Sequence, residues 1–205
     1  MALLNEDEQR QVAEAIEAVE RLTDAELVTV LAASADDYTY VPLIWAGVVA
    51  LLLPGLINFY PGWLNANELL LTQIATFIVV ALLCRLPDVI TRLVPGTVRH
   101  WRAGNLARRQ FLEQNLHATI NGTGVLIFVS EAERYVEIIV DEGISRRVDD
   151  MVWRSMVDVF TRQVGEGKIL EGFLDCIRSC GEVLGDQVPV TEPRNELSNR
   201  LVILP

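Results

Sequence analysis

Two long uncharged runs joined by a short polar and aromatic segment dominate this sequence. Residues 38–67 contain no Asp, Glu, Lys or Arg, and after Glu68 residues 69–84 are again uncharged. The segment between the runs, Asn58-Phe-Tyr-Pro-Gly-Trp-Leu-Asn-Ala-Asn67, is rich in turn formers and in aromatic residues that favour membrane interfaces. Since about 20 apolar residues cross a bilayer core, the sequence predicts a hairpin of two transmembrane helices, at about 40–59 and 66–86.

The competing interpretation is a buried helical hairpin inside a soluble protein. Roughly 150 residues lie outside the hairpin, enough for one modest domain, and no soluble core of that size needs two such runs. The chain is 51% hydrophobic, with a mean hydropathy of +0.29. It is too apolar for an ordinary soluble domain and too charged for a simple bundle of spans, so we favour the transmembrane interpretation.

Basic residues set the expected orientation of this hairpin. The turn between the spans contains no Lys or Arg, whereas six arginines follow the second span: Arg85, Arg92, Arg99, Arg102, Arg108 and Arg109. By the positive-inside rule, both termini are expected on the cytoplasmic side. The acidic start of the chain, from Met1 to Glu8, lacks the basic region of a signal peptide, so none is predicted.

Charge and cysteine usage exclude some classes of function. The net charge of −11 makes nucleic acid a poor partner, because neutralising phosphates supplies most of that affinity. The three cysteines, Cys84, Cys176 and Cys180, imply no disulfide framework. We interpret Cys176 and Cys180, four residues apart, as core or free thiols, with a redox pair as the alternative.

The polar remainder alternates helical and strand patterns. An apolar stripe at 3.6-residue spacing predicts a first helix, and short β-branched runs predict strands. The expected elements are helices at 5–22, 97–117, 147–163 and 168–186, and strands at 26–33, 125–129 and 134–140, followed by a tail at 190–205. In the helix expected at 147–163, Trp153, Val157 and Phe160 share one face and should be core.

The helix at 97–117 is expected to be basic and amphipathic. Its apolar side would comprise Val98, Trp101, Leu106, Phe111, Leu112 and Leu116, with arginines opposite. Such a helix can lie beside anionic lipid. It can also pack as an ordinary domain helix, and the two roles are compatible.

The expected domain is interrupted by the membrane hairpin. The two strands at 124–140 form an antiparallel hairpin, and the lone strand at 26–33 must join their sheet because it cannot stand alone. We therefore expect an α/β domain built from residues 1–38 and 95–189, with residues 39–94 inserted as the transmembrane hairpin and residues 190–205 as a tail.

Specific residues resemble a known family. Thr123-Gly-Val-Leu-Ile-Phe-Val-Ser-Glu-Ala-Glu-Arg-Tyr-Val-Glu-Ile-Ile-Val-Asp-Glu-Gly-Ile144 closely resembles the core of the TPM domain, named for thylakoid-lumen, photosystem II repair and nematode receptor-accessory proteins. Residues 25–30 resemble that domain's first strand, although Asp24-Ala25 replaces the usual small-Gly pair. The tail at 195–201 and the hairpin resemble a bacterial two-span membrane subgroup.

The resemblance implies a fold and a limited range of functions. The fold is an α/β/α sandwich around a small mixed sheet, and the location is the bacterial inner membrane. Members have been suggested to be acid phosphatases or to bind divalent cations, while others are accessory or assembly factors. Many members are exported and tethered by a C-terminal span, so a lumenal or extracellular role does not transfer directly.

Candidate site residues follow the ends of two strands. If the strands at 26–33 and 124–129 are parallel, Ser34, Asp36 and Asp37 lie near Ser130 and Glu131. The carboxylates of Asp36, Asp37 and Glu131 suit Ca²⁺ or Mg²⁺.

Arg134, which starts the next strand, could hold a phosphate oxygen. Together, the carboxylates and Arg134 would supply the groups that a metal-assisted phosphoester hydrolysis needs. The alternative is that both segments are simply polar loops, with Arg134 paired to Glu131 or Glu133. Glu26, at the opposite end of its strand with Asp141, is expected to be structural.

No other signature of catalysis is visible. His100 and His117 do not complete a catalytic triad or a zinc set, and there is no P-loop or nucleophile elbow. We therefore expect a non-enzymatic accessory or assembly factor that binds a protein partner at the membrane. A divalent-cation-dependent phosphatase-like hydrolase is the alternative; transport or sensing is less favoured, because the hairpin lacks an intramembrane charge.

Overall fold

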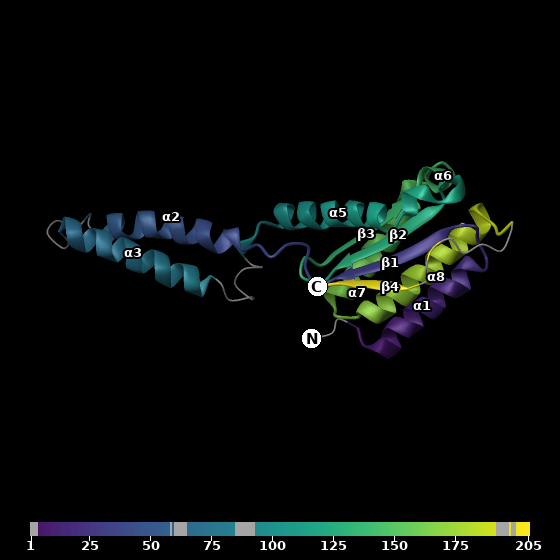
Figure 1. Ribbon diagram of the computed structural model, residues 1–205, viewed down its shortest axis with the longest axis horizontal. Coiled ribbons are helices and arrows are strands. Elements are labelled where there is room, and N and C mark those ends of the chain that lie inside the picture. Colours follow the sequence, from purple (N-terminus) through teal and green to yellow (C-terminus); the bar gives the residue numbers. More distant parts are fainter. Residues whose placement is uncertain (1–3, 58, 60–64, 85–92, 192–196, 198–199) are drawn as a thin grey trace. The chain divides into compact units, whose positions relative to one another are not determined.

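The computed structural model divides the chain into two compact units (Figure 1). It describes all residues except 1–3, 58, 60–64, 85–92, 192–196 and 198–199. The first unit comprises residues 1–35 and 100–205, and the second comprises residues 36–99. The predicted turn between the spans falls largely outside the described residues.

A four-stranded mixed sheet forms the centre of the first unit. Its strands are β1 (Glu26–Ala32), β2 (Gly124–Ser130), β3 (Tyr135–Val140) and β4 (Leu201–Leu204), in the order β3-β2-β1-β4. β1 pairs in parallel with both β2 and β4, and β2 pairs antiparallel with β3. The prediction that β1 joins this sheet is confirmed, and its parallel pairing with β2 meets the condition on which the candidate site depended.

Helices cover both faces of the sheet (Figure 1). On one face, α1 (Glu6–Glu20), α7 (Asp150–Gly165) and α8 (Ile169–Gln187) enclose the larger core together with alternate strand residues such as Leu27, Leu31 and Ile127. On the other face, α5 (Gly96–Glu113) packs against Val28, Val30 and Phe128. The result is the expected α/β/α sandwich, because strands buried on both faces are apolar at successive positions.

The face that α5 presents to the sheet differs from the prediction. Its buried residues are Ala103, Gly104, Ala107 and Gln110, whereas Trp101 is 60% and Leu112 is 56% exposed. Small side chains let the helix lie close to the strands. Leu106 and Phe111 of the predicted apolar side also pack against this core, so the prediction was wrong for Trp101 and Leu112 only. The guanidinium carbon of Arg102 lies over the Trp101 ring, 5.1 Å from the ring centroid.

The C-terminal tail contributes a strand that the sequence did not reveal. Leu201–Leu204 pairs with β1 from Thr29↔Leu201 to Ala32↔Leu204. The tail therefore makes β1 an inner strand, and the amide N–H of Ala33 donates to Leu204 O at 3.0 Å. A further short helix, α6 (Glu142–Ser145), follows β3 and is capped by the side chain of Asp141.

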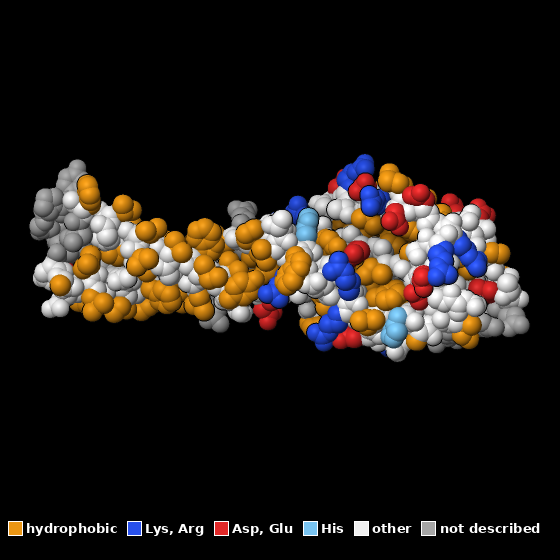
Figure 2. All heavy atoms as spheres, turned by 90° about the horizontal axis from the view of Figure 1, so that it is seen from above, with side chains coloured by type: hydrophobic (Ala, Val, Ile, Leu, Met, Phe, Trp, Pro, Cys, Tyr) orange, Lys and Arg blue, Asp and Glu red, His pale blue; other side chains and the backbone are white. Residues whose placement is uncertain are grey.

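The second unit contains the two predicted apolar helices, α2 (Tyr40–Ile57) and α3 (Ala66–Leu83). They pack against each other, and α2 turns a small-residue stripe of Ala46, Ala50 and Pro54 inward. Their outer surfaces are apolar (Figure 2). Leu51, for example, is 69% exposed. Both helices are long and apolar enough to cross a membrane. The helix continues through Pro54 to Ile57.

Candidate functional site

A buried carboxylate, Glu133, lies where β1 and β2 end. Its side chain is 3% exposed. Ser34 Oγ donates to its Oε1 at 3.2 Å, and the Ala35 amide N–H donates to its Oε2 at 3.1 Å. Ser130 Oγ also donates to Oε2. A buried carboxylate needs such partners, because an unpaired one would lose its hydration without compensation.

Strand register brings these residues together. β1 and β2 remain paired to Ala32↔Ser130, so Ser34 emerges beside the start of the β2–β3 turn. The turn prolongs the pairing, since the Glu131 amide N–H donates to Ala32 O at 3.0 Å. Arg134 closes the turn with φ 51°, in the left-handed region. This conformation reverses the chain between β2 and β3 and leaves Glu133 pointing inward.

The predicted site residues have different positions. The structure brings Ser34 and Ser130 together, as expected, but around Glu133. Glu131 and Arg134 are exposed on the turn. Asp36 belongs to the second unit, as does Asp37, and accepts a hydrogen bond from the Tyr38 amide N–H at 3.4 Å.

The cation site remains a prediction. Across the part of the chain that the structure describes, no group of three or more His, Cys, Asp or Glu residues is arranged to hold a metal ion. The site at Asp36, Asp37 and Glu131, with Arg134 for phosphate, would combine residues of both units.

Glu26 and Asp141 lie at the opposite end of the sheet. Glu26 is buried, and its Oε2 accepts a hydrogen bond from the Leu197 amide N–H at 3.2 Å. The Asp141 amide N–H donates to Gly124 O at 2.9 Å, and Gly124 is the register partner of Glu26. The side chain of Glu26 thus ties the tail to the sheet, whereas Asp141 contacts β2 through its backbone and caps α6 with its side chain.

A second polar cluster lies on the side of β3 that faces α5. The sequence predicted the strand but not this cluster. Tyr135 Oη donates to Glu137 Oε2 at 3.0 Å, and the ring of His100 lies 5.6 Å from that of Tyr135. Burial, with help from Glu137, raises the pKa of the Tyr135 hydroxyl well above its usual value. Burial also raises the pKa of Glu137. Gly104 makes room for this pair, because an added Cβ would lie 3.1 Å from Tyr135 Oη.

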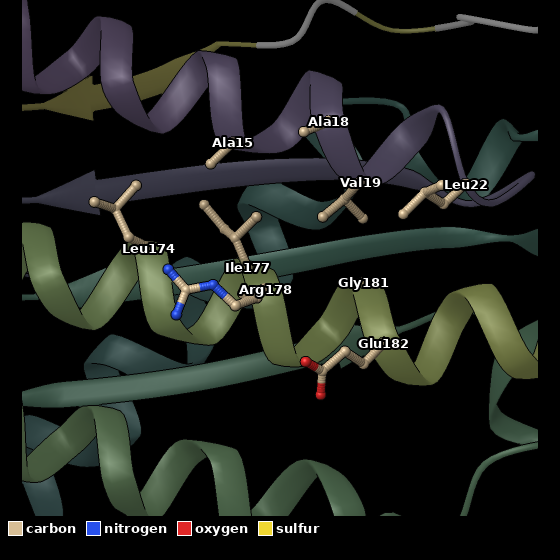
Figure 3. A pocket seen from close by; sticks show the side chains of 9 residues that line it. All are labelled: Ala15, Ala18, Val19, Leu22, Leu174, Ile177, Arg178, Gly181 and Glu182. Atoms are coloured by element: carbon tan, nitrogen blue, oxygen red, sulfur yellow. The ribbon is translucent and has the colours of Figure 1, made fainter.

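An apolar groove runs between α1 and α8 on the outside of the domain (Figure 3). It has a volume of about 400 Å³. Its lining contains the small residues Ala15, Ala18 and Gly181 and the larger Val19, Leu22, Leu174 and Ile177, with Arg178 and Glu182 at the charged margin. Leu22 is 59% exposed, although it is a large apolar residue. This groove is a concave apolar surface on the first unit.

Comparison with known proteins agrees with this architecture. Residues 91–183 match the TPM domain. The chain contains a TPM domain. The match begins before α5 and ends within α8; α1, β1 and β4 lie outside it and complete the layers of the same sandwich.

A solved structure shares the fold of this chain. The NMR structure of BA42 protein from the psychrophilic bacterium Bizionia argentinensis superimposes with a TM-score of 0.60 at 17% identity, covering 98% of this chain and 94% of that one. A search of curated proteins finds no match. At this identity the likeness establishes the fold alone.

Proposed function

We propose that this TPM protein is a membrane-anchored accessory or assembly factor that binds a helix of a partner protein in the groove between α1 and α8. The observation that carries the proposal is the groove itself, an apolar hollow of about 400 Å³ on a strongly acidic chain. Concave apolar surfaces on helical faces are a recurring way to hold amphipathic helices.

The floor of the groove is suited to close helix packing. Ala15, Ala18 and Gly181 present little side chain, so large residues of an incoming helix can reach between α1 and α8. Gly181 also sets how closely the two helices approach, because an added Cβ would lie 2.6 Å from Val19 Cγ2. Ridges of one helix fill such grooves between others.

The margins of the groove indicate the charge of the partner. Glu182 is exposed at the margin without an ion pair among those the described residues form, whereas Arg178 pairs with Asp175 at 3.4 Å. Glu14 is also exposed on α1, four residues before Ala18. We therefore propose an amphipathic partner helix with an apolar face and flanking Lys or Arg. Charge complementarity of this kind raises the association rate and the specificity.

The membrane part of the proposal rests on α2 and α3. Their length, uncharged composition and exposed apolar surfaces suit two spans of the bacterial inner membrane. The arginines after α3 favour cytoplasmic termini. Only a few residues connect β1 to α2. The partner therefore binds close to the cytoplasmic surface of that membrane.

A site-specific crosslinking experiment tests the groove. A photo-reactive residue is placed at Leu22 in the full-length protein, expressed in its native membranes, and the adduct is compared with one from Val159, an exposed position on α7. We expect a discrete adduct from Leu22 only, lost when Ala18→Arg fills the groove. Equal adducts from both positions, or an adduct that survives Ala18→Arg, would reject the groove as the binding surface.

The phosphatase-like alternative has its own test. The purified protein is titrated with Ca²⁺ and Mg²⁺ while phosphomonoester cleavage is measured. Cation-dependent activity that is lost on combined replacement of Asp36, Asp37 and Glu131 by Ala would support the hydrolase. Absence of activity and of cation-induced stabilisation would leave the accessory role.

A further inference from the structure

Three sulfur-containing side chains lie between α7 and α8. Cys180 Sγ lies 3.8 Å from Met156 Sδ. Cys176 precedes Cys180 by one helical turn, so both cysteines lie on the same face of α8. Both cysteines are buried, and Met156 packs against the same core. The two cysteines were predicted to be core thiols, but Met156 makes the group a set of three soft ligands.

We propose that Cys176, Cys180 and Met156 form a binding site for a soft metal ion, with Cu(I) as the ion that the ligand set fits best. Thiolate and thioether sulfur select Cu(I), whereas imidazole, carboxylate and carbonyl ligands suit harder or borderline ions. A thioether counts as a ligand only toward such a soft ion, so the chemistry of Met156 distinguishes Cu(I) from Mg²⁺ or Ca²⁺.

The spacing of the sulfurs fits a shared ion. With metal–sulfur bonds of about 2.3 Å, two ligands at tetrahedral to trigonal angles lie about 3.8–4.0 Å apart. The separation of 3.8 Å between Cys180 Sγ and Met156 Sδ matches this range. Ordinary contact between sulfur atoms gives a similar distance, so the inference depends also on the third sulfur and on access.

A hollow beside the sulfurs provides that access. It has a volume of about 300 Å³, and both Met156 and Cys176 line it. Cys180 lies behind them and is fully buried. Asp175 also borders the hollow, but it accepts a hydrogen bond from Gln163 Nε2 at 3.0 Å and pairs with Arg178. An ion entering the hollow therefore meets two of the three sulfurs first.

Binding changes the charge of the site in a defined way. Each thiol that forms a Cu–S bond releases its S–H proton to solvent, while the thioether of Met156 contributes a lone pair. One Cu(I) with two thiolates leaves a net charge of −1, and no oxidant or reductant takes part. Because the oxidation state of copper does not change, the proposal concerns binding and not redox catalysis.

The test uses the full-length protein in detergent under anaerobic, reducing conditions. Cu(I) is added alone and its retention is measured against a chromogenic Cu(I) chelator. We expect one Cu(I) per chain, with sulfur-only coordination by X-ray absorption. Combined Cys176→Ser and Cys180→Ser should abolish retention. Met156→Leu, which keeps the core volume, should weaken binding at least about tenfold.

Matched controls separate this site from other thiols and methionines. Cys84→Ser, at the C-cap of α3, and Met151→Leu, at an exposed position of α7, should leave Cu(I) retention unchanged. Circular dichroism of every variant checks that the fold is kept. Retention that survives loss of both cysteines, that is unchanged in a folded Met156→Leu variant, or that disappears with Cys84→Ser would overturn the proposal. So would stoichiometric disulfide formation without any copper uptake.

Discussion

Ser34 Oγ donates a hydrogen bond to Glu133 Oε1 across 99 positions of sequence, at 3.2 Å. The contact joins the segment that leaves β1 for the apolar hairpin to the turn between β2 and β3. Glu133 also accepts from Ser130 and from the Ala35 amide, so one carboxylate holds the ends of two strands together.

Replacing this carboxylate should destabilise the TPM domain. In Glu133→Ala, the hydroxyls of Ser34 and Ser130 and the Ala35 amide all lose an acceptor in a buried site. We expect the free energy of unfolding to fall by about 2–4 kcal/mol. Denaturant titration of the detergent-solubilised protein measures it. The exposed neighbour supplies the control: Glu131→Ala should change stability by less than about 0.5 kcal/mol. Similar losses from the two variants would argue against the Glu133 network.

Adding a methyl group at Gly181 should push α1 and α8 apart. The new Cβ would lie 2.6 Å from Val19 Cγ2, and the β-branched side chain of Val19 has few alternative rotamers. Overpacking of this kind costs about 1–3 kcal/mol, measurable as a lower thermal midpoint of Gly181→Ala.

Two variants control the Gly181 experiment. Gly165→Ala, where no atom lies within 4 Å of the new Cβ, should be neutral or stabilising by up to about 1 kcal/mol. Combining Val19→Ala with Gly181→Ala should recover part of the loss, because the clashing methyl groups are gone. No recovery would mean that the loss arises elsewhere.

The stability of the domain should depend on pH through Glu137. Burial raises the pKa of Glu137 above its reference value of 4.5, so the folded protein holds this proton more tightly than the unfolded chain. The folded state is therefore favoured at low pH, and this contribution is lost as pH rises from about 4.5 through the raised pKa.

Glu137→Gln isolates this contribution. The variant keeps an oxygen acceptor for Tyr135 but cannot ionise, so it should be more stable than the parent protein at neutral pH. The difference should vanish below about pH 4. Unfolding free energies measured from pH 4 to 8 give the comparison, with exposed Glu131→Gln as the control. A difference between variant and parent that does not change with pH would contradict the assignment.

Labelling of introduced cysteines should reveal the orientation of the hairpin. In a Cys84→Ser background, Asn65→Cys places a thiol at the exposed start of α3, and Glu131→Cys places one on the exposed β2–β3 turn. With both termini cytoplasmic, a membrane-impermeant maleimide should label the first in intact cells and the second only after permeabilisation. The opposite pattern would reverse the orientation, and labelling of both in intact cells would exclude the two-span arrangement.

The sequence by itself determined the apolar helices and the order of most elements. An uncharged run of sufficient length can satisfy its backbone only as a helix in an apolar setting. Short apolar, β-branched runs likewise identify β1, β2 and β3, and period-3.6 patterns identify α7 and α8, without knowledge of their partners. That β1 joins the sheet followed because a lone strand has no stable place outside a sheet, but its direction did not.

Which side chains come together depends on tertiary packing. The segment Leu201–Leu204 is too short to be predicted as a strand from its sequence, and it pairs with the edge of β1 that β2 leaves open. Glu133 and Glu131 look equivalent in sequence, but Glu133 is buried and accepts hydrogen bonds from Ser34 and Ala35, whereas Glu131 is exposed on the turn. The α1–α8 groove and the Cys180–Met156 contact join residues distant in sequence, and no local pattern encodes such packing.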